Sequence, residues 1–314
     1  MSPMLAGHMP SLSRAYTAAR LRLMRPVVRA RGAALRLLRP RRTAEHNEAL
    51  DQVPIIVLGC HRSGTSLLRR CLDSHSRIAC PPETLFLEGL AATLEYPDAD
   101  KGFAGIGLTT EVAAADLRGL IDRWMRQHAA REGKPRWADK SPGVLAYLDG
   151  LDRLLGPRVR YVAIVRDGMD VATSLGATEP RWWQLQPYLD AGGDPYLAAG
   201  RYWVERNEAL HAFLDRHPER SHLLRYTDLV TQPEDTLKAV FASLREAWEP
   251  EVLDFNAHAH APGLEDHHVS TTTRFEDNRG RHRRLPQPLQ VQLWDLVRET
   301  MLRFGYGDRS YSIV

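Results

Sequence analysis

From residue 54 onward the chain alternates short apolar runs with longer stretches that mix apolar and polar residues at helical spacing. The runs PIIVLG (54–59) and RVRYVAIV (158–165) are short and rich in β-branched residues, as buried strands are. The segment SHLLRYTDLV (221–230) predicts a third strand that runs into a turn. The hydrophobic pattern therefore predicts three strands separated by much longer segments.

Those longer segments have the spacing of amphipathic helices, and several begin at a proline or aspartate. We expect helices at 65–75, 115–130, 142–155, 167–176, 196–217 and 286–306. Strands that alternate with helices predict parallel crossover units and an α/β sheet covered on both faces. One domain over residues 51–314 is the simplest division of the chain, with residues 1–50 left as an extension.

The extension has a composition unlike the rest. Residues 1–44 contain ten arginines and no lysine, aspartate or glutamate, which leaves 32 basic and 39 acidic residues for the remaining chain. Three interpretations stay open: a flexible or loosely helical basic tail, a helix that binds a membrane surface or a partner, and a cleaved organelle transit segment. The mildly acidic remainder gives no reason to expect nucleic-acid binding.

The cysteine pattern and the lengths of the apolar stretches bear on the cellular location of the protein. The three cysteines, Cys60, Cys71 and Cys80, form no C-x-x-C pair, so neither a disulfide framework nor a thiolate zinc site is expected. No apolar stretch approaches the roughly 18–20 residues that span a bilayer. We therefore expect a cytoplasmic protein, with membrane contact only at its surface and through the basic extension.

The first strand is followed by GCHRSGTS (59–66), which has the glycine spacing of a phosphate-binding loop. Where a strand is followed by a glycine-containing loop and the start of a helix, the backbone N–H groups of the loop can point toward one anion. The lysine that follows the second glycine in nucleotide triphosphatases is absent, and Arg62 lies inside the loop instead. A tight turn without a ligand is the alternative.

A second polar signal follows the second strand. Arg166 comes at its end, where open α/β sheets bind ligands, and Ser174 lies eight residues later, about two helical turns along. An arginine and a hydroxyl so placed could clamp a phosphate. Considered alone, Arg166 next to Asp167 could equally be a local ion pair.

Five ordered segments together resemble the sulfotransferase family that uses 3′-phosphoadenosine-5′-phosphosulfate (PAPS). They are RSGTSLLRRCLDSH (62–75), PPET (81–84), DKSP (139–142), VRDGMDVATS (165–174) and RYTDLV (225–230). The likeness is nearest to the branch that includes protein-tyrosine sulfotransferases and many bacterial enzymes. It implies a P-loop-like three-layer sandwich with a central parallel sheet flanked by helices.

The resemblance also implies roles for the residues of the loop and for two further side chains. Glu83 matches the general base of the protein-tyrosine branch, with a helix-start carboxylate as the alternative. Lys140 matches a lysine that contacts the transferring sulfuryl group, with a solvated lysine at a helix start as the alternative. The loop residues that would grip the phosphosulfate are Arg62, Ser63, Gly64, Thr65 and Ser66. Arg62 would stabilise the leaving phosphate electrostatically, because a guanidinium keeps its proton in proteins.

The remaining matched residues lie at the adenosine end of the donor. Arg166 and Ser174 match residues that bind the 3′-phosphate, and Tyr226 matches an aromatic residue beside the adenosine. The cytosolic branch then carries RKG, where this chain has DNRGRHRRLP (277–286). Any of Arg279, Arg281, Arg283 and Arg284 could supply that clamp, and Ser270 is a weak match to a serine of the tyrosine branch.

We therefore expect transfer of a sulfuryl group from PAPS to a hydroxyl or amine of a sugar, lipid, small molecule or peptide tyrosine, without a required metal. The alternatives are a magnesium-dependent kinase with an unusual phosphate loop and a non-catalytic scaffold. The four histidines and two acids of residues 258–268 match no standard zinc spacing. The aromatic insertion at 180–195 either lines the acceptor pocket or packs as a loop.

Overall fold

The computed structural model describes residues 53–178, 183–189, 193–266, 269 and 271–307. All of the described helices and strands belong to one compact unit, made of residues 46–258 and 263–314. A second unit comprises residues 1–45 and 259–262, of which only 259–262 are described. The predicted basic extension thus lies outside the described residues.

Among the described residues, five parallel strands form the central sheet, in the order β2-β3-β1-β4-β5. The predicted apolar runs form β1 and β4, which are buried on both sides as crossover topology requires. The strands are β1 Ile55–Leu58, β2 Ile78–Ala79, β3 Arg136–Lys140, β4 Arg160–Val165 and β5 Ser221–Arg225.

The strand register brings the carboxyl ends of four strands to one edge. Val57 pairs with Lys140, and Leu58 with Ala163, while Val165 pairs with Arg225. The residues that directly follow β1, β3, β4 and β5 therefore emerge side by side. Ligands of open parallel sheets bind at this edge.

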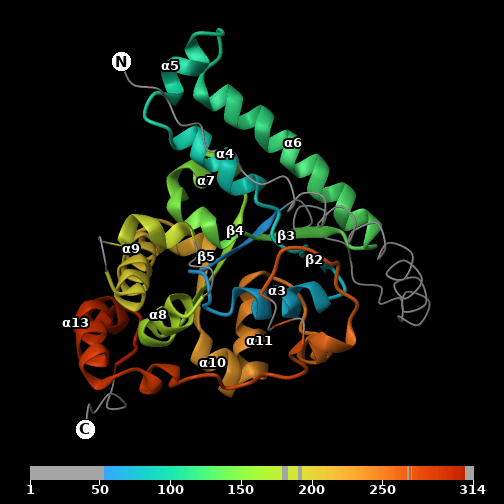
Figure 1. Ribbon diagram of the computed structural model, residues 1–314. Helices are drawn as coiled ribbons and strands as arrows, with labels where there is room; N and C mark the ends of the chain where they lie inside the picture. Colours follow the sequence, from blue (N-terminus) through green and yellow to red (C-terminus); the bar gives the residue numbers. More distant parts are fainter. Residues whose placement is uncertain (1–52, 179–182, 190–192, 267–268, 270, 308–314) are drawn as a thin grey trace, which may run out of the picture. The chain divides into compact units, whose positions relative to one another are not determined.

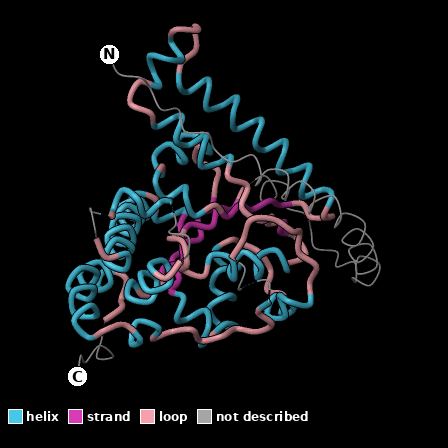
Figure 2. The backbone as a smooth tube through the Cα atoms, in the orientation of Figure 1, coloured by secondary structure: helices cyan, strands magenta, loops and turns pink. Residues whose placement is uncertain are grey.

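Helices cover both faces of the sheet, giving the predicted three-layer α/β arrangement (Figure 1). Along β1, Ile56 and Leu58 enter one hydrophobic core, whereas Ile55 and Val57 enter the other. The first core contains side chains of α4, α6, α7, α8, α9 and α13, and the second those of α3, α10 and α11. Figure 2 shows the strands as a central band between the helices.

Five of the described α-helices, α3, α6, α8, α9 and α13, correspond to predicted segments, whereas α4, α5, α10 and α11 were not predicted. The described α-helices are α3 Thr65–Ser74, α4 Phe86–Glu95, α5 Ala99–Ala104, α6 Thr110–Arg131, α7 Leu148–Leu155, α8 Gly168–Gly176, α9 Pro195–Arg216, α10 Tyr226–Thr231, α11 Pro233–Ser243 and α13 Gln287–Arg303. Short 3-10 helices are η1 Pro142–Ala146, η2 Trp183–Tyr188, η3 Pro218–Arg220, η4 Pro250–Ala257 and η5 Arg281–Arg284.

Three local predictions were wrong. The sequence pattern contains no sign of β2 or β3, because β2 has two residues and β3 (RWADK) is largely polar. Tyr226 begins α10 instead of continuing the third strand. Residues 142–155 form η1 and α7 instead of one helix, because Tyr147 between them has φ −142° and ψ 49°, which is not helical.

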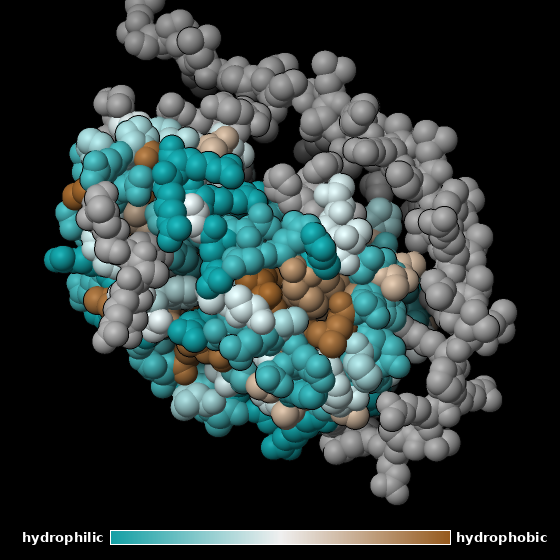
Figure 3. All heavy atoms as spheres, turned by 90° about the horizontal axis from the view of Figure 1, so that it is seen from below, coloured by the Kyte–Doolittle hydropathy of each residue, from teal (hydrophilic) through white to brown (hydrophobic). Residues whose placement is uncertain are grey.

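Within the part of the chain that the structure describes, no helix is long and apolar enough to cross a membrane. Seen from below, most of the described surface is hydrophilic, with hydrophobic side chains gathered near the middle of this face and scattered at smaller spots elsewhere (Figure 3). That surface fits the sequence composition, in which 26% of residues are charged.

Candidate active site

The loop between β1 and α3 has a backbone that few residues tolerate. Gly64 has φ 92°, and a Cβ at this position would lie 2.5 Å from Cδ2 of Tyr226. Arg62 has φ 67°, a left-handed conformation that is strained for a side chain of this kind. Strained backbone of this sort clusters at ligand sites.

The loop also contains a buried hydroxyl that has no partner among the described residues. Ser63 is fully buried, and its Oγ atom makes no hydrogen bond there. Thr65 and Ser66 begin α3 beside it and are almost fully buried. A buried polar atom without a partner is costly, so this hydroxyl at a helix start indicates a place for a polar ligand.

Lys140 joins the loop to Glu83. Its Nζ atom donates to Ser66 Oγ at 3.2 Å and to Glu83 Oε1 at 2.6 Å. Lys140 is the last residue of β3 and is fully buried, so it is not a solvated lysine. A buried ammonium needs an anionic partner, and the Glu83 carboxylate is that partner here.

The backbone on both sides of Glu83 is held in place. Its N–H donates to the carbonyl oxygen of Leu264 at 2.9 Å, and the next residue, Thr84, donates its hydroxyl to Asp139 Oδ1 at 2.8 Å. Leu85 follows with a left-handed φ of 61°. Glu83 thus lies before α4, which begins at Phe86, and not within its first turn.

Two further carboxyl groups lie near Glu83 and have raised pKa values. Burial raises the pKa of the Asp139 carboxyl to about 6. Burial, and then the neighbouring Glu83 carboxylate, raise the pKa of Glu88. Glu88 is therefore the natural comparison for Glu83 in any test of a general base.

Arg166 follows β4 and reaches across three segments of the chain. Its guanidinium donates to the carbonyl oxygens of Arg62 (3.3 Å) and Asn278 (2.7 Å). It also lies 4.5 Å from the centroid of the Tyr226 ring, within the range of a cation–π contact. Its Nε atom is buried and has no hydrogen-bond partner among the described residues.

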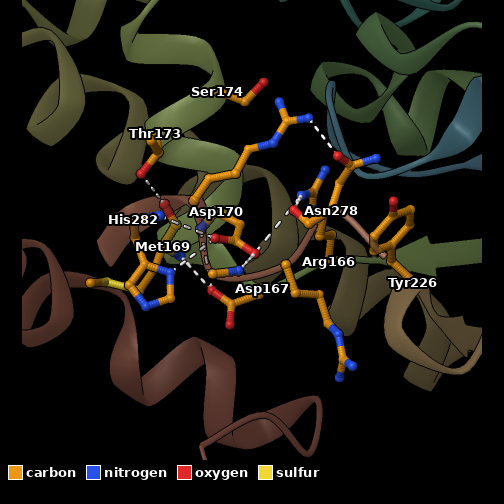
Figure 4. A network of polar contacts seen from close by, with 12 residues as sticks. Arg166, Asp167, Met169, Asp170, Thr173, Ser174, Tyr226, Asn278 and His282 are labelled. Atoms are coloured by element: carbon orange, nitrogen blue, oxygen red, sulfur yellow. Dashed lines mark hydrogen bonds and ion pairs between the residues drawn. The ribbon is translucent and has the colours of Figure 1, made fainter. Parts of the chain in front are cut away.

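Asp170 ties the C-terminal segment to α8. Its carboxylate accepts hydrogen bonds from Nδ1 of His282 (2.9 Å) and the backbone N–H of Gly280 (2.9 Å), and it lies 3.8 Å from Arg166 (Figure 4). Burial alone would raise the pKa of this carboxyl. The His282 hydrogen bond and the Arg166 charge outweigh burial, so the pKa lies below its ordinary value.

Arg62 spans two elements with its side chain. Its Nε donates to Ser174 Oγ on α8 at 3.0 Å, and its NH1 lies 2.7 Å from Asp266 Oδ2. The guanidinium is about a quarter exposed. The structure therefore brings Ser174 to Arg62, while Arg166 lies beside the Arg62 carbonyl and Tyr226.

His61 precedes Arg62 and makes a partly buried contact with α9. Its Nδ1 lies 2.8 Å from the Tyr202 hydroxyl of α9, which in turn donates to Gln184 in η2 at 3.2 Å. Burial, followed by the charges of Lys140, Arg206 and Arg62, lowers the pKa of the imidazole to about 3. A histidine with this pKa stays neutral near pH 7, as expected for a packing residue.

The four candidate arginines of residues 279–284 differ in their contacts. Arg279 pairs with Asp277 at 2.6 Å, and Arg281 donates to Asn278 Oδ1 at 2.9 Å. Arg283 and Arg284 belong to η5 with Arg281. A cavity of about 550 Å³ lies beside this segment, lined by residues that include Arg279, Arg283 and Tyr306. Of the four, Arg279 and Arg283 line this cavity.

The two remaining candidate regions are described only in part. His267, His268 and Ser270 lie outside the described residues. Among the residues that are described, no group of three potential metal ligands is found, and the two acids of this region instead contact arginines. In the aromatic insertion, η2 packs against α9 through Leu185, which is buried, whereas Trp183 is largely exposed.

Several contact residues were not predicted from the sequence. Asp139, Asp170, His282 and the pair Glu265 and Asp266 all hold the site through contacts between distant segments. Only Asp170 had a local signal, because it lies one turn after Arg166 on a helix start. The sequence alone indicates the two acids at 265 and 266 only as potential metal ligands.

The sequence matches known proteins over most of the described unit. The chain is 25% identical over 272 residues to nodulation protein NoeE of Sinorhizobium fredii, which covers 78% of this chain and 61% of that protein. It is 30% identical over 189 residues to a putative protein-tyrosine sulfotransferase of Caenorhabditis briggsae, covering 59% and 63%. The chain thus spans less than two thirds of these relatives' length.

Solved structures have the same fold. The sulfotransferase domain from the curacin biosynthetic pathway aligns with a TM-score of 0.58 at 25% identity, over 81% of this chain and 97% of that domain. The sulfotransferase domain of the Synechococcus PCC 7002 olefin synthase aligns with a TM-score of 0.53 at 19% identity, over 86% and 99%. The family model for sulfotransferases matches residues 54–250. The chain therefore belongs to the sulfotransferase family.

Proposed function

We propose that the chain transfers a sulfuryl group from PAPS to a hydroxyl or amine of an acceptor molecule. One observation carries this proposal above the others: the Lys140 ammonium contacts both the anion loop, through Ser66, and the carboxylate of Glu83. The proposed donor-binding loop and the proposed proton acceptor therefore contact the same side chain, that of Lys140. This is the proximity that a direct transfer between donor and acceptor requires.

The residues present fit a donor with two anionic ends. At one end, the loop offers the unpartnered Ser63 hydroxyl, the hydroxyls of Thr65 and Ser66, and the start of α3. At the other end, Arg166 offers its unpartnered Nε beside the Tyr226 ring. We assign the first set to the 5′-phosphosulfate and Arg166, Ser174 and Tyr226 to the 3′-phosphoadenosine.

Each catalytic side chain then has one task. The donor supplies a sulfuryl group that is activated by its bond to phosphate. Glu83 accepts the proton of the acceptor hydroxyl as that oxygen attacks sulfur. Lys140 lies between the loop and Glu83, where it stabilises charge on the sulfuryl oxygens. Arg62 stabilises the negative charge that the phosphate gains when the S–O bond breaks.

A sulfuryl group carries less charge than a terminal phosphate, so two side-chain cations suffice at the reacting centre. Lys140 and Arg62 are those cations, and neither occupies the lysine position of a nucleotide triphosphatase loop. This arrangement favours a phosphosulfate over a nucleotide triphosphate with magnesium.

Incubation with sulfur-35-labelled PAPS tests the proposal directly. The purified protein is offered one acceptor of each chemical class, and release of 3′,5′-adenosine bisphosphate is followed together with labelled product. We expect release of the bisphosphate in step with labelling of at least one acceptor. Absence of donor binding and of release with every class would refute the proposal and favour a non-catalytic scaffold.

A further inference from the structure

Residues 263–266, here called the strap, run along the edge of the donor site. They contact three elements of that site at once. The Leu264 carbonyl accepts the N–H of Glu83, Glu265 pairs with arginines of α3, and Asp266 pairs with Arg62. The strap therefore touches the proposed base, the loop helix and the loop arginine within four residues.

Glu265 anchors the strap on α3. One of its oxygens lies 2.9 Å from Arg69 NH2, and the other pairs with Arg70. Arg69 is fully buried and Arg70 nearly so, and two buried guanidinium groups need an anion close by. Burial would raise the pKa of the Glu265 carboxyl, but these arginines outweigh it and lower the pKa below its ordinary value. Glu265 thus remains an ionised anchor.

Asp266 directs its carboxylate to the cation of the loop. Its Oδ2 lies 2.7 Å from NH1 of Arg62, and its backbone N–H donates to Ser66 Oγ at 3.4 Å. Arg62 and Ser66 are two of the residues assigned above to the phosphosulfate. A carboxylate thus pairs with the same guanidinium that is assigned to the donor's anionic group.

We propose that Asp266 is an internal competitor of the donor and so a determinant of donor affinity. Its carboxylate neutralises Arg62 until a phosphosulfate replaces it at the same guanidinium. Both side chains are about a quarter exposed, so the pair can open without unfolding the strap, which Leu264 and Glu265 continue to hold. This inference rests on the proposed function, because it takes Arg62 to be part of the donor site.

If Asp266 competes with the donor, removal of its carboxylate should strengthen binding of the donor. The probe is 3′,5′-adenosine bisphosphate, titrated by calorimetry into the wild-type protein and into Asp266→Asn at one salt concentration. Because a part-exposed ion pair is weak, we expect Asp266→Asn to bind about three- to tenfold more tightly and to release the probe more slowly. Asp266→Glu, which keeps the charge, should bind like the wild type.

A matched control separates local competition from net charge. Glu234→Gln removes one negative charge from an exposed ion pair with Lys238 in α11 and should change affinity by less than about twofold. Thermal unfolding of every variant verifies that the fold is intact, and Asp266→Ser serves as a second test should the asparagine variant fail to fold.

The outcomes separate this inference from the proposed function. Wild-type protein that binds the bisphosphate, with Asp266→Asn and Asp266→Ser no tighter, would overturn the competitor alone. Wild-type protein that does not bind the bisphosphate at all would overturn the proposed function and the competitor with it. Equal tightening by Glu234→Gln would show a general charge effect and would also contradict the local competition.

Discussion

The site is assembled from two regions that are held in place by different forces. The framework, meaning the strand ends and the loops and helices that follow β1, β2, β3 and β4, is positioned by the two hydrophobic cores. The closing segment, meaning the described part of residues 263–284, has one aromatic contact with a core, that of Phe275 with Phe255, and is otherwise positioned mainly by single polar contacts. Glu265 pairs with α3, Asn278 accepts from Arg166, and His282 donates to Asp170.

This difference indicates how each region should respond to substitution. Hydrophobic burial is spread over many side chains, so one polar substitution on the framework changes chemistry more than structure. A buried ion pair is concentrated in two groups, and loss of one partner leaves the other uncompensated. Substitutions in the framework should therefore affect mainly turnover or binding, whereas those at the buried contacts of the closing segment should affect stability and binding together.

The largest expected effect is that of Glu83→Gln, on the framework. Glutamine keeps a hydrogen-bond acceptor for Lys140 but cannot take a proton, so turnover should fall roughly 10²- to 10⁴-fold. Affinity for 3′,5′-adenosine bisphosphate should hardly change, because the general base faces the acceptor. Steady-state rates and calorimetry on the same preparation measure both quantities.

Glu88→Gln is the matched control for this substitution. Glu88 is a half-buried carboxylate whose pKa is raised by burial and by Glu83, but it makes no contact with Lys140 in the described structure. Its loss should therefore lower turnover much less. A larger loss for Glu88→Gln than for Glu83→Gln, or equal losses of rate and affinity for Glu83→Gln, would contradict the base assignment.

The next effect is that of Arg166→Ala on donor binding. Loss of a charged hydrogen-bond donor to a phosphate should weaken binding of the bisphosphate about 10- to 100-fold. Arg220→Ala is the control, since Arg220 directly precedes β5, at the opposite end of that strand, and pairs with Asp152. Full affinity in the Arg166→Ala protein would refute the 3′-phosphate assignment.

Asp170→Asn tests the link between framework and closing segment. The variant weakens a buried, charge-assisted contact with His282, so the free energy of unfolding should fall by about 1–3 kcal/mol, with weaker donor binding. Because the pKa of Asp170 lies below its ordinary value in the fold, its contribution is present near neutral pH and is lost in acid below that ordinary value.

Urea unfolding at neutral pH and at about pH 3 measures this contribution. The difference between wild type and Asp170→Asn should shrink as the pH falls. A variant with weaker binding but unchanged stability would show that the Asp170–His282 contact does not stabilise the fold. That result would contradict the proposed difference between the framework and the closing segment.

The smallest effect belongs to His61→Gln. The imidazole has a pKa of about 3 and is neutral near pH 7, so its substitution should leave the pH–rate profile unchanged between about pH 6 and 8. Loss of one hydrogen bond to Tyr202 should lower the rate less than about tenfold. A histidine whose pKa is lowered by folding destabilises the fold in acid, so the variant should also resist acid better than the wild type.

The framework was predictable from the sequence because periodic burial leaves a periodic pattern. The runs at 54–59 and 158–165 correspond to β1 and β4, and Arg62 and Arg166 were placed correctly after these strands. Strand β3 was not predicted, because its buried Arg136, Asp139 and Lys140 find their partners in distant segments, which no local pattern records.

The closing segment was not predictable for the same reason. Glu265 and Asp266 act through arginines that lie about 200 positions earlier in the chain, and nothing in GLEDHH indicates that partnership. The residues of the donor side were predicted through the family resemblance, whereas the polar contacts that hold them required the structure. The roles of the site residues remain predictions.

The most direct test of the central claim compares two ligands by calorimetry: 3′,5′-adenosine bisphosphate, and ATP with magnesium. The proposed site lacks the loop lysine of nucleotide triphosphatases and has Arg62, Lys140 and Arg166 in its place. We predict tight binding of the bisphosphate that magnesium does not improve, and weak binding of ATP. Tight, magnesium-dependent binding of ATP with no binding of the bisphosphate would contradict the account and identify a kinase.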